Sequence, residues 1–297
     1  MSEPFRCGYA CIIGRPNVGK SSLLNKFIGQ KLSITSKKPQ TTRWQLLGIK
    51  TTADFQMIFI DTPGLQTRRQ SNLNRHMQRE MVDSLAYVNV IVMVVEAIVW
   101  KPPEDQILAI ISKHKTPVIL LINKIDKLKN KERLLPFIDS ISAKYNFQEI
   151  IPVSAVTDDN IDLVEKTITP LLPPGPAAFP EDQLSDRNER FFAAEFIREK
   201  LTRILGAELP YKISVTIDKY TDKKIALHII SSIWVESEGQ KKIVIGKDGK
   251  NLKSVGTRAR IDMEQMFGKK VFLETWVKVR KKWTGDVRAL RQFGYEA

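Results

Sequence analysis

The chain has 297 residues, enough for two ordinary domains that each bury a hydrophobic core. Its 47 basic residues outnumber its 33 acidic residues, and the net charge of +14 favours a polyanionic partner such as nucleic acid or an anionic membrane surface. The two cysteines, the lack of a signal-peptide pattern and a longest apolar run of only residues 90–95 argue against secreted disulfide scaffolds and integral membrane proteins. We therefore expect a cytoplasmic protein.

The first 172 residues alternate short apolar runs with amphipathic segments. The apolar runs predict strands at 8–13, 45–51, 55–60, 88–95, 117–122 and 149–153. The segments between them predict helices at 20–28, 71–86, 103–113, 131–145 and 160–170. This alternation predicts a doubly wound α/β domain over 1–172, with a mostly parallel sheet that binds its ligand at the carboxyl ends of the strands.

A proline-rich segment then separates a second domain. Prolines at 173, 174, 176 and 180 exclude a helix or central strand, so we predict a linker over 173–184. The elements expected after it are a helix at 187–205, strands at 211–218 and 223–235, a helix at 249–266 and a strand at 270–280. This α-β-β-α-β order predicts a small α+β domain over 185–297. The positive charge is concentrated there, because residues 241–297 hold 15 basic and 6 acidic residues.

Residues 14–21, GRPNVGKS, match the phosphate-binding pattern G-x-x-x-x-G-K-[ST] between the first predicted strand and the first predicted helix. Gly14 and Gly19 allow the backbone to turn its N–H groups toward phosphate oxygens, and the helix adds its positive N-terminal end. We expect Lys20 to reach the β- and γ-phosphates and Ser21 to ligate Mg²⁺. The motif predicts nucleotide binding without distinguishing ATP from GTP.

Two further motifs follow later strands. Asp61-Thr62-Pro63-Gly64 follows strand 55–60, where a carboxylate can support bound Mg²⁺ and the Gly64 N–H can meet the γ-phosphate. Asn123-Lys124-Ile125-Asp126 follows strand 117–122. The Asp126 carboxylate can accept two hydrogen bonds from guanine, whereas adenine would leave that charge unpaired. We expect Lys124 to lie over the base and Asn123 to tie neighbouring loops together.

Two shorter segments complete the predicted nucleotide site. Ser154-Ala155 follows strand 149–153, where the backbone N–H of Ala155 can reach guanine O6. The segment 39–43, PQTTR, lies where a switch loop would respond to the γ-phosphate. We assign Thr42 as a Mg²⁺ ligand, with Thr41 as the alternative; the other interpretation is a solvated threonine-rich loop.

Together these motifs resemble the five nucleotide-binding motifs of the GTPase superfamily, at 14–21, 40–44, 61–64, 123–126 and 153–155. The forms GRPNVGKS, QTTR and DTPG are similar to those of bacterial Era-type GTPases. The resemblance implies GTP/GDP and Mg²⁺ as ligands, with Ser21 and Thr42 on the metal. The nucleotide-binding residues that it implies are Asn17, Val18, Gly19, Lys20, Ser21, Ser22, Asp61, Thr62, Gly64, Asn123, Lys124, Asp126, Ser154 and Ala155.

Leu65 stands where Ras-like enzymes carry the glutamine that positions water. Leucine cannot orient water, so we expect slow GTP hydrolysis that depends on the backbone, on other side chains or on a partner. Related GTPases use an asparagine at the position of Asn17 to hold a potassium ion beside the phosphates. The residues expected to carry catalysis are Lys20, Thr42, Gly64 and Asn17, with stimulation by K⁺ or by an RNA partner.

A G-x-x-G sequence, residues 246–249, precedes the predicted helix 249–266. KH modules use this loop to hold four nucleotides, and the element order with the local basic charge resembles the type II KH fold. The other interpretation is an ordinary loop in a basic domain. The apolar residues Ile243, Ile245, Leu252 and Val255 are expected at the base-binding groove, some of them in the core. The residues expected to contact RNA are Ile245, Gly246, Lys247, Asp248, Gly249, Lys250, Lys253 and Arg258.

Era-type GTPases pair these two domains, and the resemblance covers essentially the whole chain. It implies binding near the 3′ end of 16S rRNA and assistance in small (30S) ribosomal subunit assembly, with GTP ordering switch segments at 34–43 and 61–80. One alternative is a membrane-surface regulatory GTPase that uses the basic tail, 279–293, on anionic lipid of the inner membrane. Another is a binding module in which the nucleotide is only structural or regulatory. We expect a monomer.

Overall fold

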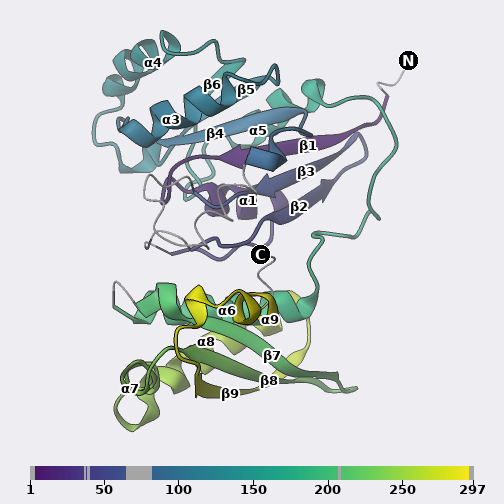
Figure 1. The fold of residues 1–297 in the computed structure, drawn as a ribbon. Helices are drawn as coiled ribbons and strands as arrows, with labels where there is room; N and C mark the ends of the chain where they lie inside the picture. The colour runs from purple at the N-terminus through teal and green to yellow at the C-terminus, as the bar shows by residue number, and fades with distance from the viewer. Residues whose placement is uncertain (1–3, 37, 39–40, 65–81, 207–208, 294–297) are drawn as a thin grey trace. The chain divides into compact units, whose positions relative to one another are not determined.

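The computed structural model describes residues 4–36, 38, 41–64, 82–206 and 209–293, which form two compact units (Figure 1). The first unit contains residues 4–33, 42–64 and 82–186. The second contains residues 187–293 together with the described part of segment 34–41. Among the described residues, the second unit is therefore assembled from parts of the sequence that lie more than 140 positions apart.

A six-stranded sheet forms the centre of the first unit, in the spatial order β2-β3-β1-β4-β5-β6. Strand β2 runs antiparallel to β3, and every other neighbouring pair is parallel. This topology confirms the predicted α/β domain with a mostly parallel sheet. The strands are β1 (Arg6–Ile13), β2 (Leu46–Thr51), β3 (Phe55–Asp61), β4 (Val90–Glu96), β5 (Val118–Asn123) and β6 (Glu149–Pro152).

Helices cover both faces of this sheet (Figure 1), which explains why its central strands are continuous apolar runs. Every residue from Val90 to Val95 is fully buried. The predicted helix at 71–86 falls almost entirely on residues outside the described ones. The helices of the first unit are α1 (Lys20–Ile28), α3 (Pro102–Ile111), α4 (Leu134–Ser142) and α5 (Ile161–Ile168), with short 3₁₀ turns at Ile125–Lys127, Lys131–Arg133 and Thr169–Leu171.

Residues 173–186 are hydrogen-bonded to the first unit. The Cys7 N–H donates to the Pro173 carbonyl at 3.1 Å. Buried Gln56 on β3 accepts from the Ala178 and Phe179 N–H groups at 2.8 and 2.9 Å and donates to the Phe179 carbonyl at 2.8 Å. These backbone and side-chain contacts hold a proline-rich stretch that has no helix or strand of its own.

The second unit has a three-stranded sheet, β7-β8-β9, in which β7 and β8 are antiparallel and β8 and β9 are parallel. Figure 1 shows α6 and α8 packed on one side of it. Val255, Ala259 and Met263, four residues apart, form the buried stripe of α8. The elements are α6 (Glu189–Ile204), β7 (Ser214–Asp222), β8 (Ala226–Val235), α7 (Glu238–Ile245), α8 (Lys250–Phe267), β9 (Lys270–Val279) and α9 (Val287–Gln292), with 3₁₀ turns at Leu209–Lys212, Lys247–Gly249 and Trp283–Gly285.

The predicted α-β-β-α-β order is incomplete, because α7 stands between β8 and α8. The apolar run before the G-x-x-G loop lies at the end of this helix, where Val244 is buried and Ile243 is 54% exposed. The helix has a start signal in the sequence, since Ser237 accepts a hydrogen bond from the Gln240 N–H at 3.3 Å. In the part of the chain that the structure describes, we find no helix with the length and apolar character to cross a membrane.

Candidate nucleotide site and switch segment

The phosphate-binding loop joins β1 to α1. Gly14, Asn17 and Gly19 have φ angles of +157°, +65° and +106°, so the loop turns through conformations that favour glycine. A Cβ at Gly14 would lie 2.5 Å from the Val94 carbonyl oxygen, so only glycine fits there. Lys20 opens α1 and donates from Nζ to the Gly14 and Arg15 carbonyls, both at 3.1 Å.

Lys20 is 6% exposed, and this burial lowers its pKa to about 8. The charge is held by carbonyl oxygens, with the Asp61 carboxylate favouring it and Arg15 opposing it. A buried ammonium group that is held by neutral carbonyl oxygens is well suited to binding phosphate oxygens.

Two hydroxyl groups donate to Asp61 at the end of β3, and a third contacts one of them. Its Oδ2 accepts hydrogen bonds from Ser21 Oγ and Ser33 Oγ, both at 2.8 Å, and Ser21 Oγ lies 2.8 Å from Thr42 Oγ1. Burial raises the pKa of Asp61, although Lys20 opposes the shift. Its other oxygen, Oδ1, is buried without a hydrogen-bond partner among the described residues. Mg²⁺ prefers hard oxygen ligands, so these hydroxyls and this carboxylate fit the metal.

Ser33 is a site residue that the motifs missed. Asn25 on α1 fixes its backbone, because Asn25 Oδ1 accepts from the Leu32 and Ser33 N–H groups at 2.9 and 2.8 Å and Nδ2 donates to the Ser33 carbonyl at 2.7 Å. No short pattern marks this residue. Its position just before the predicted switch segment was the available signal.

Asn123 at the end of β5 connects three of the predicted motifs. Its side chain donates to the Val18 carbonyl at 2.8 Å and accepts from the N–H groups of Lys124 at 2.8 Å and Ala155 at 3.3 Å. Lys124 Nζ in turn donates to the Asn17 carbonyl at 2.6 Å. The phosphate-binding loop and the two predicted guanine-binding segments are thus joined by hydrogen bonds.

Asp126 is exposed next to these segments, and its Oδ1 accepts from Ser154 Oγ at 2.7 Å. Ser154 Oγ also accepts from the Val156 and Thr157 N–H groups at 3.2 and 3.1 Å. The second carboxylate oxygen of an aspartate held in this way can face a guanine base. The structure therefore brings the 14–21, 123–126 and 154–155 motifs together.

The remaining predicted residues lie nearby. Val18 is buried, Ser22 lies in α1, and Thr62 Oγ1 donates to the Ile12 carbonyl at 2.8 Å. A Cβ at Gly64 would lie 2.7 Å from the Pro16 nitrogen, so the chain passes too closely there for a side chain. Leu65, Pro39 and Gln40 and almost all of the predicted switch at 61–80 lie outside the described residues.

A charged network beside the phosphate-binding loop was also missed from the sequence. Arg15 donates from Nε to Glu104 Oε1 at 2.6 Å and from Nη2 to Glu96 Oε2 at 2.9 Å. The other oxygen of Glu96 lies 3.1 Å from Lys124 Nζ. Burial raises the pKa of Glu96, but hydrogen bonds from Arg15 and Lys124 outweigh that effect and hold the pKa below its usual value. Glu96 therefore links two of the predicted motifs.

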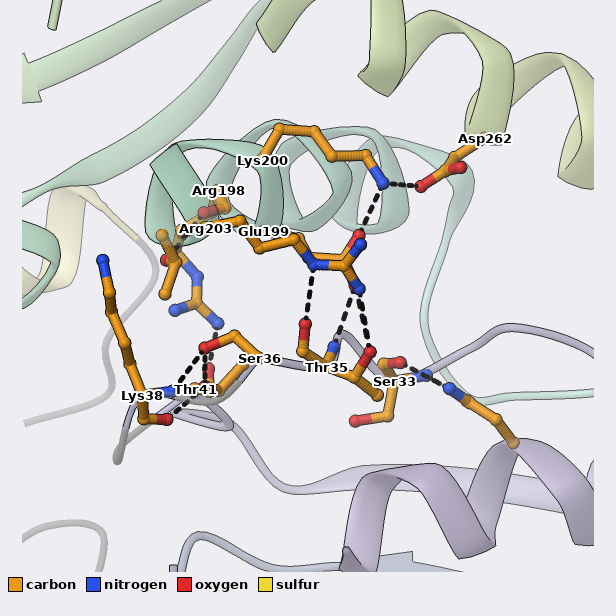
Figure 2. Close-up of polar contacts among 12 residues, drawn as sticks. Ser33, Thr35, Ser36, Lys38, Thr41, Arg198, Glu199, Lys200, Arg203 and Asp262 are labelled. Carbon is orange, nitrogen blue, oxygen red and sulfur yellow. Dashed lines mark hydrogen bonds and ion pairs between the residues drawn. The ribbon is translucent and has the colours of Figure 1, made fainter. Parts of the chain in front are cut away.

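The segment between Ser33 and Thr42 belongs to the second unit and contacts helix α6 (Figure 2). Glu199 Oε1 accepts from the Thr35 N–H at 3.0 Å, and Arg203 donates to the Thr35 carbonyl at 3.1 Å and to Thr35 Oγ1 at 3.0 Å. Arg198 donates to the Thr41 carbonyl. The predicted switch threonines therefore divide: Thr41 is held by α6, while Thr42 lies beside Ser21.

The same glutamate is connected to α8 (Figure 2). Glu199 is fully buried, and its Oε2 accepts from Lys200 Nζ at 2.7 Å. Lys200 also forms an ion pair with Asp262 on α8. Desolvation lowers the pKa of Lys200, but its two carboxylate partners outweigh that effect and raise it. A chain of polar contacts thus runs from Thr35 through Glu199 and Lys200 to the helix that follows the G-x-x-G loop.

The G-x-x-G loop joins α7 to α8. Gly246 and Gly249 have φ angles of +74° and +72°, and a Cβ at Gly246 would lie 2.7 Å from the Asn251 side chain. Asn251 Nδ2 donates to the Ile243 carbonyl at 3.0 Å and fixes the loop from the α8 side. Of the predicted RNA-binding residues, Lys247, Asp248, Lys250, Lys253 and Arg258 are exposed and Ile245 is half-buried; of the predicted groove residues, Leu252 is half-buried and Val255 lies in the core.

Comparison with known proteins agrees with both units. The family described as "50S ribosome-binding GTPase" matches residues 9–124, and a KH domain family matches residues 208–284. GTPase Era of Coxiella burnetii (strain Dugway 5J108-111) is 50% identical over 294 residues, which cover 99% of each chain. The chain belongs to the Era GTPase family. It is therefore a GTPase that uses GTP/GDP and Mg²⁺. The expected combination of a GTPase domain with a C-terminal type II KH domain is confirmed.

Other Era proteins agree along the full length. GTPase Era of Marinobacter nauticus is 49% identical over 97% of this chain and 95% of its own. A crystal structure of Era in complex with MgGDPNP and nucleotides 1506–1542 of 16S ribosomal RNA has a TM-score of 0.94 and 40% identity, covering 99% of this chain and all of that one. A crystal structure of a single-residue variant of Aquifex aeolicus Era bound to GDP.AlF4⁻ also has a TM-score of 0.94, with 39% identity over the same shares of the two chains.

Proposed function

We propose that this Era-family GTPase is a GTP-driven switch that binds the 3′ end of 16S rRNA through its G-x-x-G loop and assists assembly of the small (30S) ribosomal subunit. The RNA assignment is supported by the similarity to the Era structure that holds MgGDPNP and nucleotides 1506–1542 of 16S rRNA. The exposed lysines around Gly246 and Gly249 supply the charge that phosphate contacts need.

The placement of the switch segment carries the proposal that GTP controls RNA binding. Ser33 and Thr42 contact Asp61 and Ser21 in the first unit, whereas Thr35, only two residues from Ser33, contacts α6 in the second. A change in the position of Thr42 must therefore act on the backbone that α6 holds. Two ends of one short segment report on the nucleotide and on the RNA-binding unit.

At the nucleotide, we propose that the N–H groups of the phosphate-binding loop and Lys20 hold the phosphates and that Asp126 selects guanine. When bound, Mg²⁺ supplies positive charge that neutralises the phosphates, with Ser21 and Thr42 as its protein ligands. Asn17 is an exposed residue of this loop, and we propose that its side chain helps to hold K⁺. GTP turnover by Asn17→Ala should then become equal in K⁺ and Na⁺; a wild type indifferent to the cation would overturn the potassium role.

Fluorescence anisotropy with an RNA probe of the 3′-terminal 16S sequence tests the RNA assignment, with a scrambled probe at matched salt. We expect sequence-specific binding that differs between GDP and a non-hydrolysable GTP analogue. The double variant Gly246→Asp/Gly249→Asp should abolish it. The control Gly206→Asp/Gly285→Asp adds the same charge to the second unit at exposed glycines with open space around them, and it should bind normally. Equal, salt-sensitive binding to both probes would contradict the proposal.

We further propose a cytoplasmic monomer. The membrane alternative rests on the basic residues that follow β9, among them Arg280, Lys281, Lys282 and Arg288. Sedimentation with vesicles of anionic lipid compares it directly with RNA binding, and we expect little of the protein to sediment with the vesicles at the salt concentration of the RNA titrations. Vesicle binding as tight as specific RNA binding would favour the membrane-surface function.

A further inference from the structure

The three-stranded sheet of the second unit has an open face opposite α6 and α8, and two large aromatic side chains lie on it. Along β9, Val271 and Val277 are buried, while Phe272 and Trp276 are 58% and 56% exposed. Because side chains alternate along a strand, the residues of β9 that share the open face are Lys270, Phe272, Glu274, Trp276 and Lys278. Burial in the core does not account for these aromatic residues.

Neighbouring side chains support the two exposed rings. Phe272 pairs in register with His228 of β8, and their ring centroids lie 5.3 Å apart. Trp276 donates from Nε1 to Glu274 Oε1 at 2.9 Å. The rings are therefore partly fixed before any partner arrives, which lowers the entropy lost on binding.

The charge on this face suits a polyanion. Three lysines, Lys219, Lys270 and Lys278, lie on this face with two acidic residues, Asp218 and Glu274, and Lys278 forms an ion pair with Asp218 at 3.2 Å. Lys270 and Lys278 stand at the two ends of the aromatic row, and Lys219 of β7 pairs with Ile230 on the same face. Lysines that alternate with exposed aromatic rings are typical of surfaces that stack single-stranded nucleic acid.

The spacing of the rings favours RNA over a protein partner. Phe272 and Trp276 are four residues apart on one strand, about 13 Å, with the charged Glu274 between them. Cores of protein interfaces are contiguous and depleted of charge, so this arrangement does not fit one. Bases of an extended strand can stack on separate rings, and a carboxylate between them can accept from an exocyclic amine.

We propose that this open face, centred on Phe272 and Trp276, is a second RNA site that stacks bases of the single strand continuing beyond the G-x-x-G loop. It rests on the proposed function, because the loop must hold the first nucleotides. Lys278 lies near the end of β9, where β9 pairs with the last residues of β8. Helix α7 starts three residues after β8 and leads to the G-x-x-G loop, so this end of the open face is connected to the loop by a short stretch of chain. A KH loop holds four nucleotides, whereas the RNA in the solved Era complex spans 1506–1542.

Two RNA lengths separate this site from the loop. The full-length protein is titrated with a probe of about six nucleotides, which fills the loop, and with one of about sixteen. We expect Phe272→Ala and Trp276→Ala each to weaken binding of the longer probe about tenfold and to leave the shorter one unchanged. Trp276→Phe keeps a stacking ring and should retain most of the affinity. Tyr87→Ala removes an aromatic ring that is 84% exposed in the first unit and should change neither.

Tryptophan emission provides an independent measurement. The longer probe should quench the emission of the wild-type protein more than the shorter one, and Trp276→Phe should remove that extra quenching. The second site is refuted if both probes bind the wild type equally tightly, or if Trp276→Ala weakens both alike. If the shorter probe does not bind the wild type at all, the proposed function itself fails, which is a distinguishable outcome.

Discussion

Glu199→Gln should destabilise the second unit by about 3 kcal/mol. The wild-type carboxylate accepts from the Thr35 N–H at 3.0 Å, Arg203 at 2.8 Å and Lys200 at 2.7 Å, and it is fully buried. Glutamine keeps the shape of the side chain but has no negative charge. Its NH₂ group also replaces one carboxylate oxygen, so one of the three donor groups faces another donor. Hydrogen bonds to charged groups contribute about 1.5–3 kcal/mol, and breaking a buried ion pair costs about 3–5 kcal/mol.

We expect the low end of that range because both cations keep other partners. Lys200 retains Asp262, and the Arg203 side chain is 46% exposed to water. For a unit of this size, about 3 kcal/mol corresponds to a fall in Tm of about 10 °C. Scanning calorimetry should show that fall in the transition of the second unit. Glu189→Gln, at the exposed start of the same helix, should change Tm by less than about 3 °C.

The same substitution should weaken the coupling between nucleotide and RNA. With the contact to Thr35 disrupted, the ratio of RNA affinities in the GTP-analogue and GDP states should move toward one, as measured by anisotropy below the new Tm. A second-unit transition that shifts by less than about 2 °C would refute the stability estimate. An unchanged ratio in a variant that has lost stability would show that Glu199 only holds α6 in place.

Three further changes test the nucleotide site. Asp126→Asn should weaken GTP binding by at least about tenfold, because the amide cannot accept both guanine hydrogens, and xanthosine triphosphate should bind better than it does to the wild type; competition titrations check both. Glu96→Gln should raise the GDP dissociation rate about five- to tenfold, because Arg15 and Lys124 lose the carboxylate that they share. The control Glu132→Gln, at an exposed residue of the same unit, should leave the rate unchanged. Release of a fluorescent GDP analogue measures both rates. Lys20→Met should abolish nucleotide binding yet raise the stability of nucleotide-stripped protein at pH 7. Folding holds the pKa of Lys20 at about 8, below its ordinary 10.5, so keeping the lysine charged costs about 3 kcal/mol below pH 8, and thermal melts should show the advantage of methionine disappearing as pH rises toward 10.5.

The nucleotide site was predictable because its motifs are short and follow strands. Lys20, Asp61, Asn123 and Ser154 each stand at the end of a recognisable apolar run or the start of a helix, so the parallel sheet brings them to one edge. The order of the motifs along the chain then indicates which part of the nucleotide each residue contacts. The fold class follows from the same alternation of strands and helices.

The parts that could not be predicted depend on contacts between distant residues. The Arg15–Glu104 pair spans 89 positions and the Thr35–Glu199 contact spans 164, and no local pattern marks either. Helix α7 was missed because its exposed face carries Ile243, so its apolar residues do not keep to one side. The exposure of Trp276 could not be predicted for a similar reason. Alternating residues predict a strand, but they do not show which face of the sheet the helices cover.

The division of the chain at Ser33 and Thr42 has a mechanical consequence. The backbone crosses between the two units after residue 33, again before residue 42, and once more after residue 186, so at least three covalent connections join them. A protease cut in the proline-rich stretch would leave the first two intact, and the halves would still migrate together under native conditions. A fragment starting at residue 187 would lack segment 34–41, which contacts α6, and would expose Glu199 to water. Segment 34–41, which we propose to respond to the nucleotide, is therefore also a covalent connection between the units, in addition to the one through the proline-rich stretch.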